Sequence, residues 1–314
     1  MEQFNNYDDI RLPSGMIDLR KIEGKIKAKE LNRKIYFKDN STFKPQMSVK
    51  SPYNELIAEE LAKDFGIECA HYEVAGLEEG GKRCFSEDFI GDKFAITFED
   101  MQYSLWVNNP KFDERVTIEL IRDMLEVFPK DVDESRIDSE DIEKYHKYKR
   151  SLTEEEINKV MDEVNKIYVF DVLIANSDNN PGNFGIMLDE NGVTPIPSFD
   201  NEMILNNHAM SKGAFAMLPD SEVVKNKSDY SDPFDVIIHY FQKPENEKYA
   251  DLFKDKLWII SEENIEDVIK RVETRTKTTI DENTKNEYKE RFRKYNENLL
   301  DVMNYINDPL FGFK

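Results

Sequence analysis

The chain has 314 residues, of which 39% are hydrophobic, 11% aromatic and 34% charged. The apolar content is sufficient for a globular protein, and the length favours about two domains. Lys and Arg number 43 against 64 Asp and Glu, and the net charge of −21 disfavours nucleic acid and, more mildly, anionic lipid surfaces as partners.

The sequence carries no sign of membrane insertion or of a secretion signal. No run approaches the roughly 18 apolar residues of a spanning helix, and the start MEQFNNYDDIRL is acidic and polar. Cys69 and Cys84 lack metal-ligand spacing, so we expect ordinary buried thiols. These features favour a cytoplasmic protein and leave open a secreted effector.

The first 90 residues predict short strands around one helix. Residues 35–38 (IYFK) predict a strand, and SPYNELIAEELAKDFG predicts a helix with Ser51 as its cap, Pro52 in its first turn and Gly66 at its end. The segments IECAHYEVAGL and KRCFSEDFI predict two strands joined by the turn EEGGK.

From about residue 93 the pattern changes to helices. Residues 113–128 and 153–175 are predicted to be helical, and the second segment has a clear helical spacing of apolar residues. The charged segment between them, at 130–151, is expected to be a mobile insertion. Further helices are predicted in DPFDVIIHYFQ, at 246–258, at 262–275 and over a long final segment.

The stretch FDVLIANSDNNPGNFGIMLDENGVTPIPSFDNE, residues 170–202, places polar side chains beside apolar runs. A hairpin that turns at DENG would bring Asp178, Asn183 and Asp200 to one end. Two carboxylates and an amide oxygen suit Mg²⁺, which binds through a few protein oxygens and nucleotide phosphates. The alternative is that NNPG is a surface turn and that both acids are solvated.

Several segments resemble the HipA-like serine/threonine kinase family. NSDNNPGNFGIM followed by PIPSFDNE is similar to its catalytic and metal-binding segments. KIYFKDN resembles the strand with the nucleotide-facing lysine, and NELIAEELAKDFGIECAHYEVAG resembles the regulatory helix and the next strand. RCFSEDFI stands where the family has its interlobe hinge. These segments together span residues 34–202.

The resemblance implies an α+β, two-lobed protein-kinase-like fold. The small strand-rich N-lobe would be residues 1–90, with the lysine strand and regulatory helix, and the large helical C-lobe would be residues 91–314. The chain resembles the shorter members of the family, which lack an extra N-terminal domain. ATP and Mg²⁺ are the implied cofactors, and a protein with a Ser or Thr acceptor, including the enzyme itself, is the implied substrate.

The family's roles carry over to residues that match its motifs. Asp178 would be the general base that accepts the proton of the attacking hydroxyl, and Asn183 and Asp200 would hold Mg²⁺.

The remaining roles concern the nucleotide. Lys38 would contact its phosphates, Glu55 would pair with that lysine, and Glu87 and Phe89 of the hinge segment would border the nucleotide.

Two of these assignments have competitors within reach. Glu59 lies one turn after Glu55 on the same predicted helix, and one of the two is expected to be solvated. Lys34 and Lys44 are alternatives to Lys38, which could instead be a charge that protects an edge strand.

Two departures from the family pattern matter. Asn179 and Asn180 stand where the family often has Arg-His, and no G-x-G-x-x-G loop precedes Lys38. The turns at Ser14-Gly15 and in KELNRK are the candidates for the phosphate loop. Residues 201–232 stand where an activation or substrate loop would lie.

Two other functions stay open at this stage. One is a small-molecule or lipid phosphotransferase on the same scaffold. The other is a pseudokinase that binds a partner without turnover, which the missing glycine loop favours and the intact set of Asp178, Asn183 and Asp200 disfavours. Hydrolase chemistry has no support, because no Ser-His-Asp order or nucleophile-elbow motif occurs.

Overall fold

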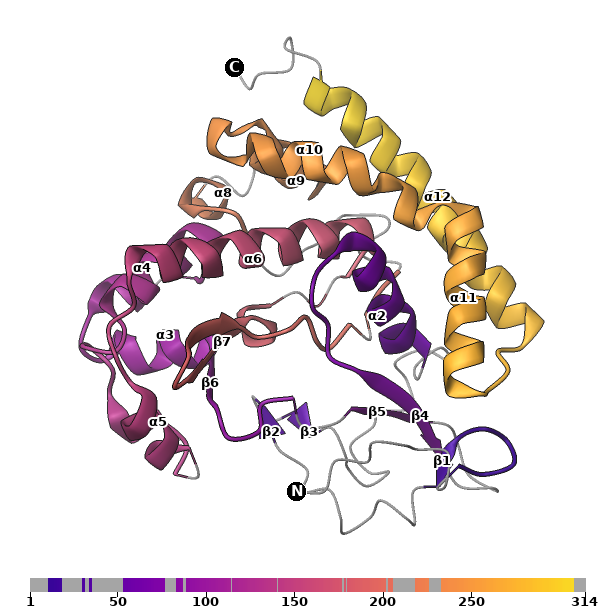
Figure 1. Ribbon diagram of the computed structural model, residues 1–314. Helices are drawn as coiled ribbons and strands as arrows, with labels where there is room; N and C mark the ends of the chain where they lie inside the picture. The colour runs from indigo at the N-terminus through magenta and orange to yellow at the C-terminus, as the bar shows by residue number, and fades with distance from the viewer. Residues whose placement is uncertain are drawn as a thin grey trace.

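A computed structural model of the chain shows an arrangement of many helices and short strands (Figure 1). Several of the helices begin at a capping side chain, such as Thr97, Thr117 and Thr153. The described residues are 11–18, 30–31, 34–35, 53–76, 83–86, 89–113, 115–139, 141–176, 178, 180–201, 203–205, 218–225 and 233–307. Within these ranges no helix is both long and apolar enough to cross a membrane. Lys38, Lys44 and Glu87 lie outside the described residues, as do Ser51 and Pro52.

The N-terminal part contains two small sheets. In the first, β4 (Tyr72–Gly76) pairs in parallel with β1 (Ile17–Asp18) and antiparallel with β5 (Arg83–Ser86). In the second, β2 (Glu30–Leu31) and β3 (Lys34–Ile35) form an antiparallel pair. The predicted strands before and after the EEGGK turn are therefore present.

Helix α2 (Tyr53–Phe65) is the predicted helix of the N-terminal part. Gly66 ends it with a φ of +97°, a conformation that glycine adopts without a steric penalty. In Figure 1 α2 lies beside α6 and α11, and it also contacts β4. Because it packs on several sides, even Glu55, Glu59 and Glu60 are buried.

A second three-stranded sheet has the order β6-β7-β8 and belongs to the larger, C-terminal part of the chain. Its strands are β6 (Phe94–Thr97), β7 (Gly185–Asp189) and β8 (Gly192–Pro195), all antiparallel. The β7–β8 hairpin with its turn before Gly192 is confirmed. Strand β6 was not predicted, because its four residues run directly into a helix that Thr97 caps.

Most of the other described residues are helical, and the start of a long central helix carries a full capping box between Thr153 and Glu156. The α-helices are α3 (Phe98–Trp106), α4 (Ile118–Val127), α5 (Ile142–Tyr148), α6 (Glu154–Leu173), α8 (Ser221–Lys225), α9 (Pro233–Gln242), α10 (Glu247–Lys256), α11 (Glu262–Thr276) and α12 (Glu282–Asn307). Short 3₁₀ turns are η2 (Pro110–Asp113), η3 (Glu134–Arg136), η4 (Pro181–Asn183), η5 (Pro244–Asn246) and η6 (Leu257–Ile260).

The charged segment at 130–151 differs from the expected mobile insertion. It contains η3 and α5, and Tyr145 of α5 is 1% exposed and packs against the rings of Phe94 and Phe128. The Lys149 ammonium also pairs with Glu134 at 2.5 Å. One buried aromatic side chain thus anchors a segment whose composition alone indicates a solvated loop.

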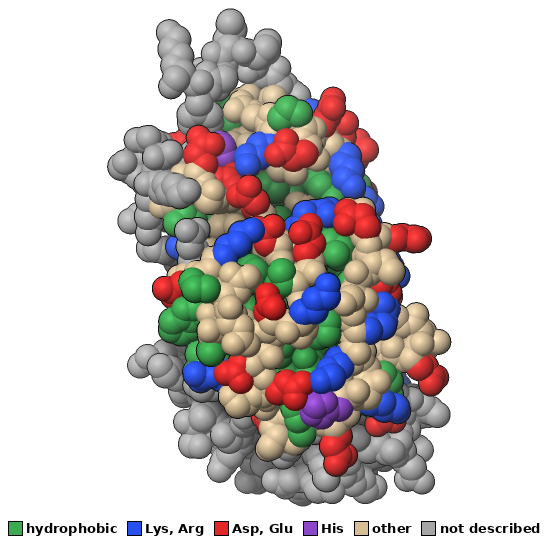
Figure 2. Space-filling view, turned by 90° about the vertical axis from the view of Figure 1, so that its left-hand side faces the viewer, with side chains coloured by type: hydrophobic (Ala, Val, Ile, Leu, Met, Phe, Trp, Pro, Cys, Tyr) green, Lys and Arg blue, Asp and Glu red, His purple; other side chains and the backbone are tan. Residues whose placement is uncertain are grey.

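Figure 2 shows one face of the molecule, on which acidic and basic side chains are interspersed rather than separated into fields of one sign. Ion pairs in the C-terminal part likewise join neighbouring basic and acidic side chains. Examples are Lys111 with Asp123 at 2.6 Å and Arg122 with Glu154 at 2.9 Å. On this face, the excess of acidic residues does not form a single acidic field.

Candidate active site

The loop that carries Asp178 begins where α6 ends and is fixed by the side chain of Asn176. Ala175 has a φ of +52°, which turns the chain out of the helix. The Asn176 amide donates from Nδ2 to Oδ1 of Asp171 (3.0 Å), and its Oδ1 accepts the backbone N–H of Asp178 (3.2 Å). Asn176 and Asp171 are both 2% exposed. The backbone of Asp178 is therefore anchored to the buried end of α6.

Besides Asn176, two further asparagines contact Asp178 directly. Asn180 donates from Nδ2 to the Asp178 carboxylate oxygen Oδ1 (2.9 Å), and its own Oδ1 accepts the N–H of Gly182 (2.9 Å). Asn183 donates from Nδ2 to the backbone carbonyl of Asp178 (2.5 Å). Asn180 thus supplies a contact at one of the two positions where the family often has Arg-His, while Asn179 lies outside the described residues.

After the Asp178 loop, the chain forms the antiparallel β7–β8 hairpin. Gly185 opens β7 with its backbone against β6, where an added Cβ would lie 2.3 Å from the carbonyl oxygen of Ile96. Only glycine permits this approach. The turn residue Asn191 donates its N–H to Oδ1 of Asp189 (2.7 Å), and Asp189 pairs with Gly192 in the strand register.

After β8 the chain pairs with the segment that follows α2. The backbone of Ser198 donates to the carbonyl of Glu68 (3.0 Å) and accepts from the N–H of Ala70 (2.8 Å). Phe199 is 2% exposed, and its ring lies 5.9 Å from that of Phe89, the predicted hinge aromatic. This pairing presents Asp200 at the edge of the N-terminal part.

A buried amide pair joins the Asp178 loop to the Asp200 turn. Asn176 donates from Nδ2 to Oδ1 of Asn201 (3.2 Å), and Asn201 is 0% exposed. Because Asn176 precedes Asp178 by two positions and Asn201 follows Asp200, this contact brings both acidic residues to one end of the hairpin. The Asp178 loop, which Asn183 also contacts, and the Asp200 turn are therefore joined, and the convergence of the three side chains on one cation stays a prediction.

Glu55 and Tyr72 reach the same turn from the N-terminal part. The backbone N–H of Asn201 donates to Oε2 of Glu55 (2.8 Å), and that of Asp200 donates to the hydroxyl of Tyr72 (3.1 Å). Glu55 on α2 is 8% exposed and Tyr72 on β4 is 3% exposed. The structure thus places Glu55 beside the Asp200 turn.

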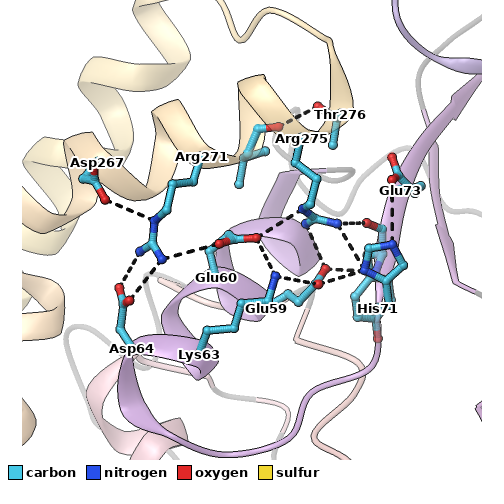
Figure 3. A network of polar contacts seen from close by, with 12 residues as sticks. Glu59, Glu60, Lys63, Asp64, His71, Glu73, Asp267, Arg271, Arg275 and Thr276 are labelled. Carbon is cyan, nitrogen blue, oxygen red and sulfur yellow. Dashed lines mark hydrogen bonds and ion pairs between the residues drawn. The ribbon is translucent and has the colours of Figure 1, made fainter. Parts of the chain in front are cut away.

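Glu59, the competitor of Glu55, faces α11 instead, as Figure 3 shows. Its carboxylate contacts the Arg275 guanidinium (2.9 Å), Nδ1 of His71 (2.9 Å) and the Tyr72 N–H (3.0 Å). Burial by itself raises the pKa of Glu59, but the His71 hydrogen bond and the Arg275 charge outweigh it and lower the pKa to about 2. The expectation that one of the two glutamates is solvated is wrong, because α2 is covered on both sides.

A second arginine extends this contact along α2. Arg271 donates to both carboxylate oxygens of Asp64, at 3.0 and 2.5 Å, and lies 3.5 Å from Glu60. The hydrogen bonds to Glu59 and Glu73 raise the pKa of His71 to about 9, so His71 is charged at neutral pH. We call Glu59, Glu60, Asp64, Arg271 and Arg275 the α2–α11 clamp.

The structure describes parts of both segments that the sequence offered as candidates for the phosphate loop. Gly15 has a φ of +89°, and an added Cβ would lie 1.8 Å from the carbonyl oxygen of Lys277 in the α11–α12 connection. Arg11 reinforces this packing with bonds to the carbonyls of Gly15 and Thr276. The Ser14-Gly15 turn therefore packs against the connection between α11 and α12. Glu30, Leu31 and Lys34 of the KELNRK segment lie in the pair formed by β2 and β3.

The donor set at the end of the hairpin fits a hard cation bound together with phosphate. Asn183 is 5% exposed, and its amide nitrogen is bonded to the Asp178 carbonyl, so the amide oxygen is the atom suited to a cation. Asp200 would supply a carboxylate oxygen. Among the described residues no group of three or more His, Cys, Asp or Glu forms a metal site, and a kinase-type site needs fewer protein ligands because phosphates complete it.

Comparison with known proteins supports the fold. No protein-family model and no curated protein matches the sequence. The fold is an α+β, protein-kinase-like fold with a strand-rich N-terminal part and a large helical C-terminal part, as the sequence predicted. It is similar to the crystal structure of the Helicobacter pylori proinflammatory kinase CtkA, with a TM-score of 0.52 and 14% identity over 82% of this chain and 84% of that chain.

A second structural match is HipA of Shewanella oneidensis, solved with HipB and operator DNA. Its TM-score is 0.47 and its identity 15%, over 81% of this chain and 57% of that chain. The resemblance to HipA-like kinases is confirmed at the level of the fold by the CtkA structure, and the roles of individual residues remain predictions.

Proposed function

We propose that this chain is an ATP- and Mg²⁺-dependent protein kinase of the HipA type that phosphorylates serine or threonine hydroxyl groups, its own among them. The observation that carries the proposal is the buried Asn176–Asn201 contact. It joins the Asp178 loop to the Asp200 turn, which supports a common site for the two acidic residues. The kinase-like fold of CtkA supports the same conclusion.

Asp178 is the proposed general base. Its backbone is held by Asn176 and Asn183, and its carboxylate accepts a hydrogen bond from Asn180, so the carboxylate has a defined orientation. A base placed in this way accepts the proton of a bound hydroxyl as the phosphoryl group is transferred, and most of the rate comes from positioning and charge neutralisation.

Asn183 and Asp200 are the proposed metal ligands. When bound, Mg²⁺ would neutralise charge on the nucleotide phosphates. In the same proposal Lys38 contacts those phosphates and pairs with Glu55, whose position beside the Asp200 turn suits that role. Phe89, packed on Phe199, would border the nucleotide together with Glu87.

A protein is the proposed substrate. The excess of 64 acidic over 43 basic residues repels nucleic acid and anionic lipid surfaces, and is compatible with a polypeptide acceptor. A lipid or small-molecule phosphotransferase would use the same residues, so the identity of the acceptor is settled by experiment.

The test is intact-mass spectrometry of phosphatase-treated protein after incubation with ATP and Mg²⁺. The wild type is expected to gain about 80 daltons, the mass of one phosphoryl group, and Asp178→Asn to gain none. Asp189→Asn is the matched control, because Asp189 lies at the far end of the same hairpin, where its carboxylate contacts the Asn191 N–H and the Lys93 ammonium. It should behave as the wild type does.

The other outcomes separate the alternatives. An equal gain in wild type and Asp178→Asn would refute the role of Asp178. No gain in any protein, combined with ATP consumption when a protein extract or a small hydroxyl compound is added, would show a kinase whose acceptor lies elsewhere. No gain, no ATP consumption and no nucleotide-induced shift of the melting temperature would indicate a pseudokinase or another binding protein.

A further inference from the structure

Two consecutive backbone N–H groups of the Asp200 turn are bound by side chains of the N-terminal part. Tyr72 accepts the N–H of Asp200 at 3.1 Å, and Glu55 accepts that of Asn201 at 2.8 Å. Glu55 already has a proposed role, whereas no sequence motif singled out Tyr72.

The backbone conformation of Asp200 explains why these two hydrogen bonds matter. Its φ is +59°, in the left-handed region that side chains other than glycine rarely adopt. The direction of its carboxylate depends on keeping this backbone conformation, and a hydrogen bond to its own N–H is the most direct constraint. A metal ligand that is held in this way is pre-organised for its cation.

Tyr72 is itself held on both sides of its backbone. Its N–H donates to Oε2 of Glu59 (3.0 Å), and its carbonyl accepts a hydrogen bond from Arg275 of α11 (2.7 Å). Glu59 and Arg275 are paired with each other at 2.9 Å. The α2–α11 clamp therefore fixes the point from which the Tyr72 side chain extends to Asp200.

We propose that Tyr72 is a positioning residue for Asp200: its hydroxyl orients the metal-binding carboxylate, and Arg275 and Glu59 hold Tyr72 in place. This inference rests on the proposed function, because it assigns Asp200 to the Mg²⁺ that accompanies ATP. The inference means that Tyr72 of β4 and the helix α11 help to hold the site residues in position.

The test measures the Mg²⁺ dependence of nucleotide binding, with a non-hydrolysable ATP analogue and without any turnover. Tyr72→Phe removes only the hydroxyl. Tyr240→Phe is the matched control, because Tyr240 is 1% exposed and donates its hydroxyl to Oδ1 of Asn165 (2.6 Å), away from Asp200. Both substitutions remove the hydroxyl of a buried tyrosine, so the melting temperatures of the two variants should fall to a similar extent.

Tyr72→Phe should raise the half-saturating Mg²⁺ concentration by about 10-fold, the usual effect of losing a group that orients a metal ligand. Tyr240→Phe should leave it unchanged. Equal half-saturation in wild type and Tyr72→Phe would overturn the inference alone, and so would equal shifts in both variants, since these would reflect lost stability. A wild type that binds no nucleotide at any Mg²⁺ concentration would overturn the proposed function, and this inference with it.

Discussion

Arg275→Met removes the central cation of the α2–α11 clamp and keeps most of the apolar length of the side chain. The arginine contacts Glu59 at 2.9 Å, Glu60 at 3.1 Å and the Tyr72 carbonyl at 2.7 Å. The side chains of Glu59 and Glu60 are 4% and 6% exposed, and that of Arg275 is 21% exposed. The substitution therefore leaves two buried carboxylates with fewer partners.

The expected loss of unfolding free energy is about 2–3 kcal/mol. Breaking a buried ion pair by removing one partner typically costs about 3–5 kcal/mol, and the remaining contacts of Glu59 with His71 and Lys63 reduce that figure. The reduced loss is still a large part of a typical domain's total of about 5–15 kcal/mol.

Urea denaturation of four proteins measures this directly: wild type, Arg275→Met, Glu59→Gln and the double variant. We expect a coupling energy of about 1–3 kcal/mol, as for residues in one polar network. Arg293→Met is the control, because its pairs with Glu290 and Glu297 are about half exposed and should contribute much less to stability. Equal losses in Arg275→Met and Arg293→Met would refute the reasoning.

Three further predictions concern His71, Gly185 and Glu55. The pKa of His71 is raised to about 9, so its contribution to stability is complete below its ordinary pKa of 6.5 and disappears as the pH rises through about 9. Because His71 is 46% exposed, the loss should be about 1 kcal/mol rather than the roughly 3 of the bare shift, and denaturation of wild type and His71→Gln on both sides of that range checks it. Gly185→Ala should destabilise the hairpin by about 1–3 kcal/mol because its Cβ would meet the Ile96 carbonyl, and an unchanged melting temperature would contradict this. Glu55→Gln should lower phosphorylation on the order of 100-fold with a small change in melting temperature, and the assignment of Glu55 fails if Glu59→Gln abolishes phosphorylation while Glu55→Gln does not.

Local signals predicted much of this fold. The helix that ends at Gly66 and the hairpin that turns before Gly192 depend on neighbours within a few positions, and the structure contains both. The residues of the candidate site were proposed in the same way, because Asp178 and Asp200 flank a recognisable hairpin. Resemblance to a family supplied their roles, and those roles remain predictions.

The features that were missed depend on contacts between distant segments. Strand β6 gains its identity only by pairing with β7, about ninety positions later. Asn176 and Asn201 meet in the buried core, and neither has a local pattern that distinguishes it from the many other asparagines of this chain. Tyr72 contacts Asp200 with its hydroxyl, whereas the strand periodicity indicates only that its ring is buried.

The pair Glu55 and Glu59 shows where reasoning from one sequence reaches its limit. Residues four positions apart lie close together on one side of a helix, so periodicity assigns them the same environment. In the fold, α2 lies between the Asp200 turn and α11. Because the two side chains point in slightly different directions from the helix, one contacts the turn and the other contacts α11. Glu55 thereby meets the backbone of Asn201, while Glu59 meets Arg275. Only the packing of α11, encoded two hundred positions away, separates a candidate nucleotide-site residue from a structural one.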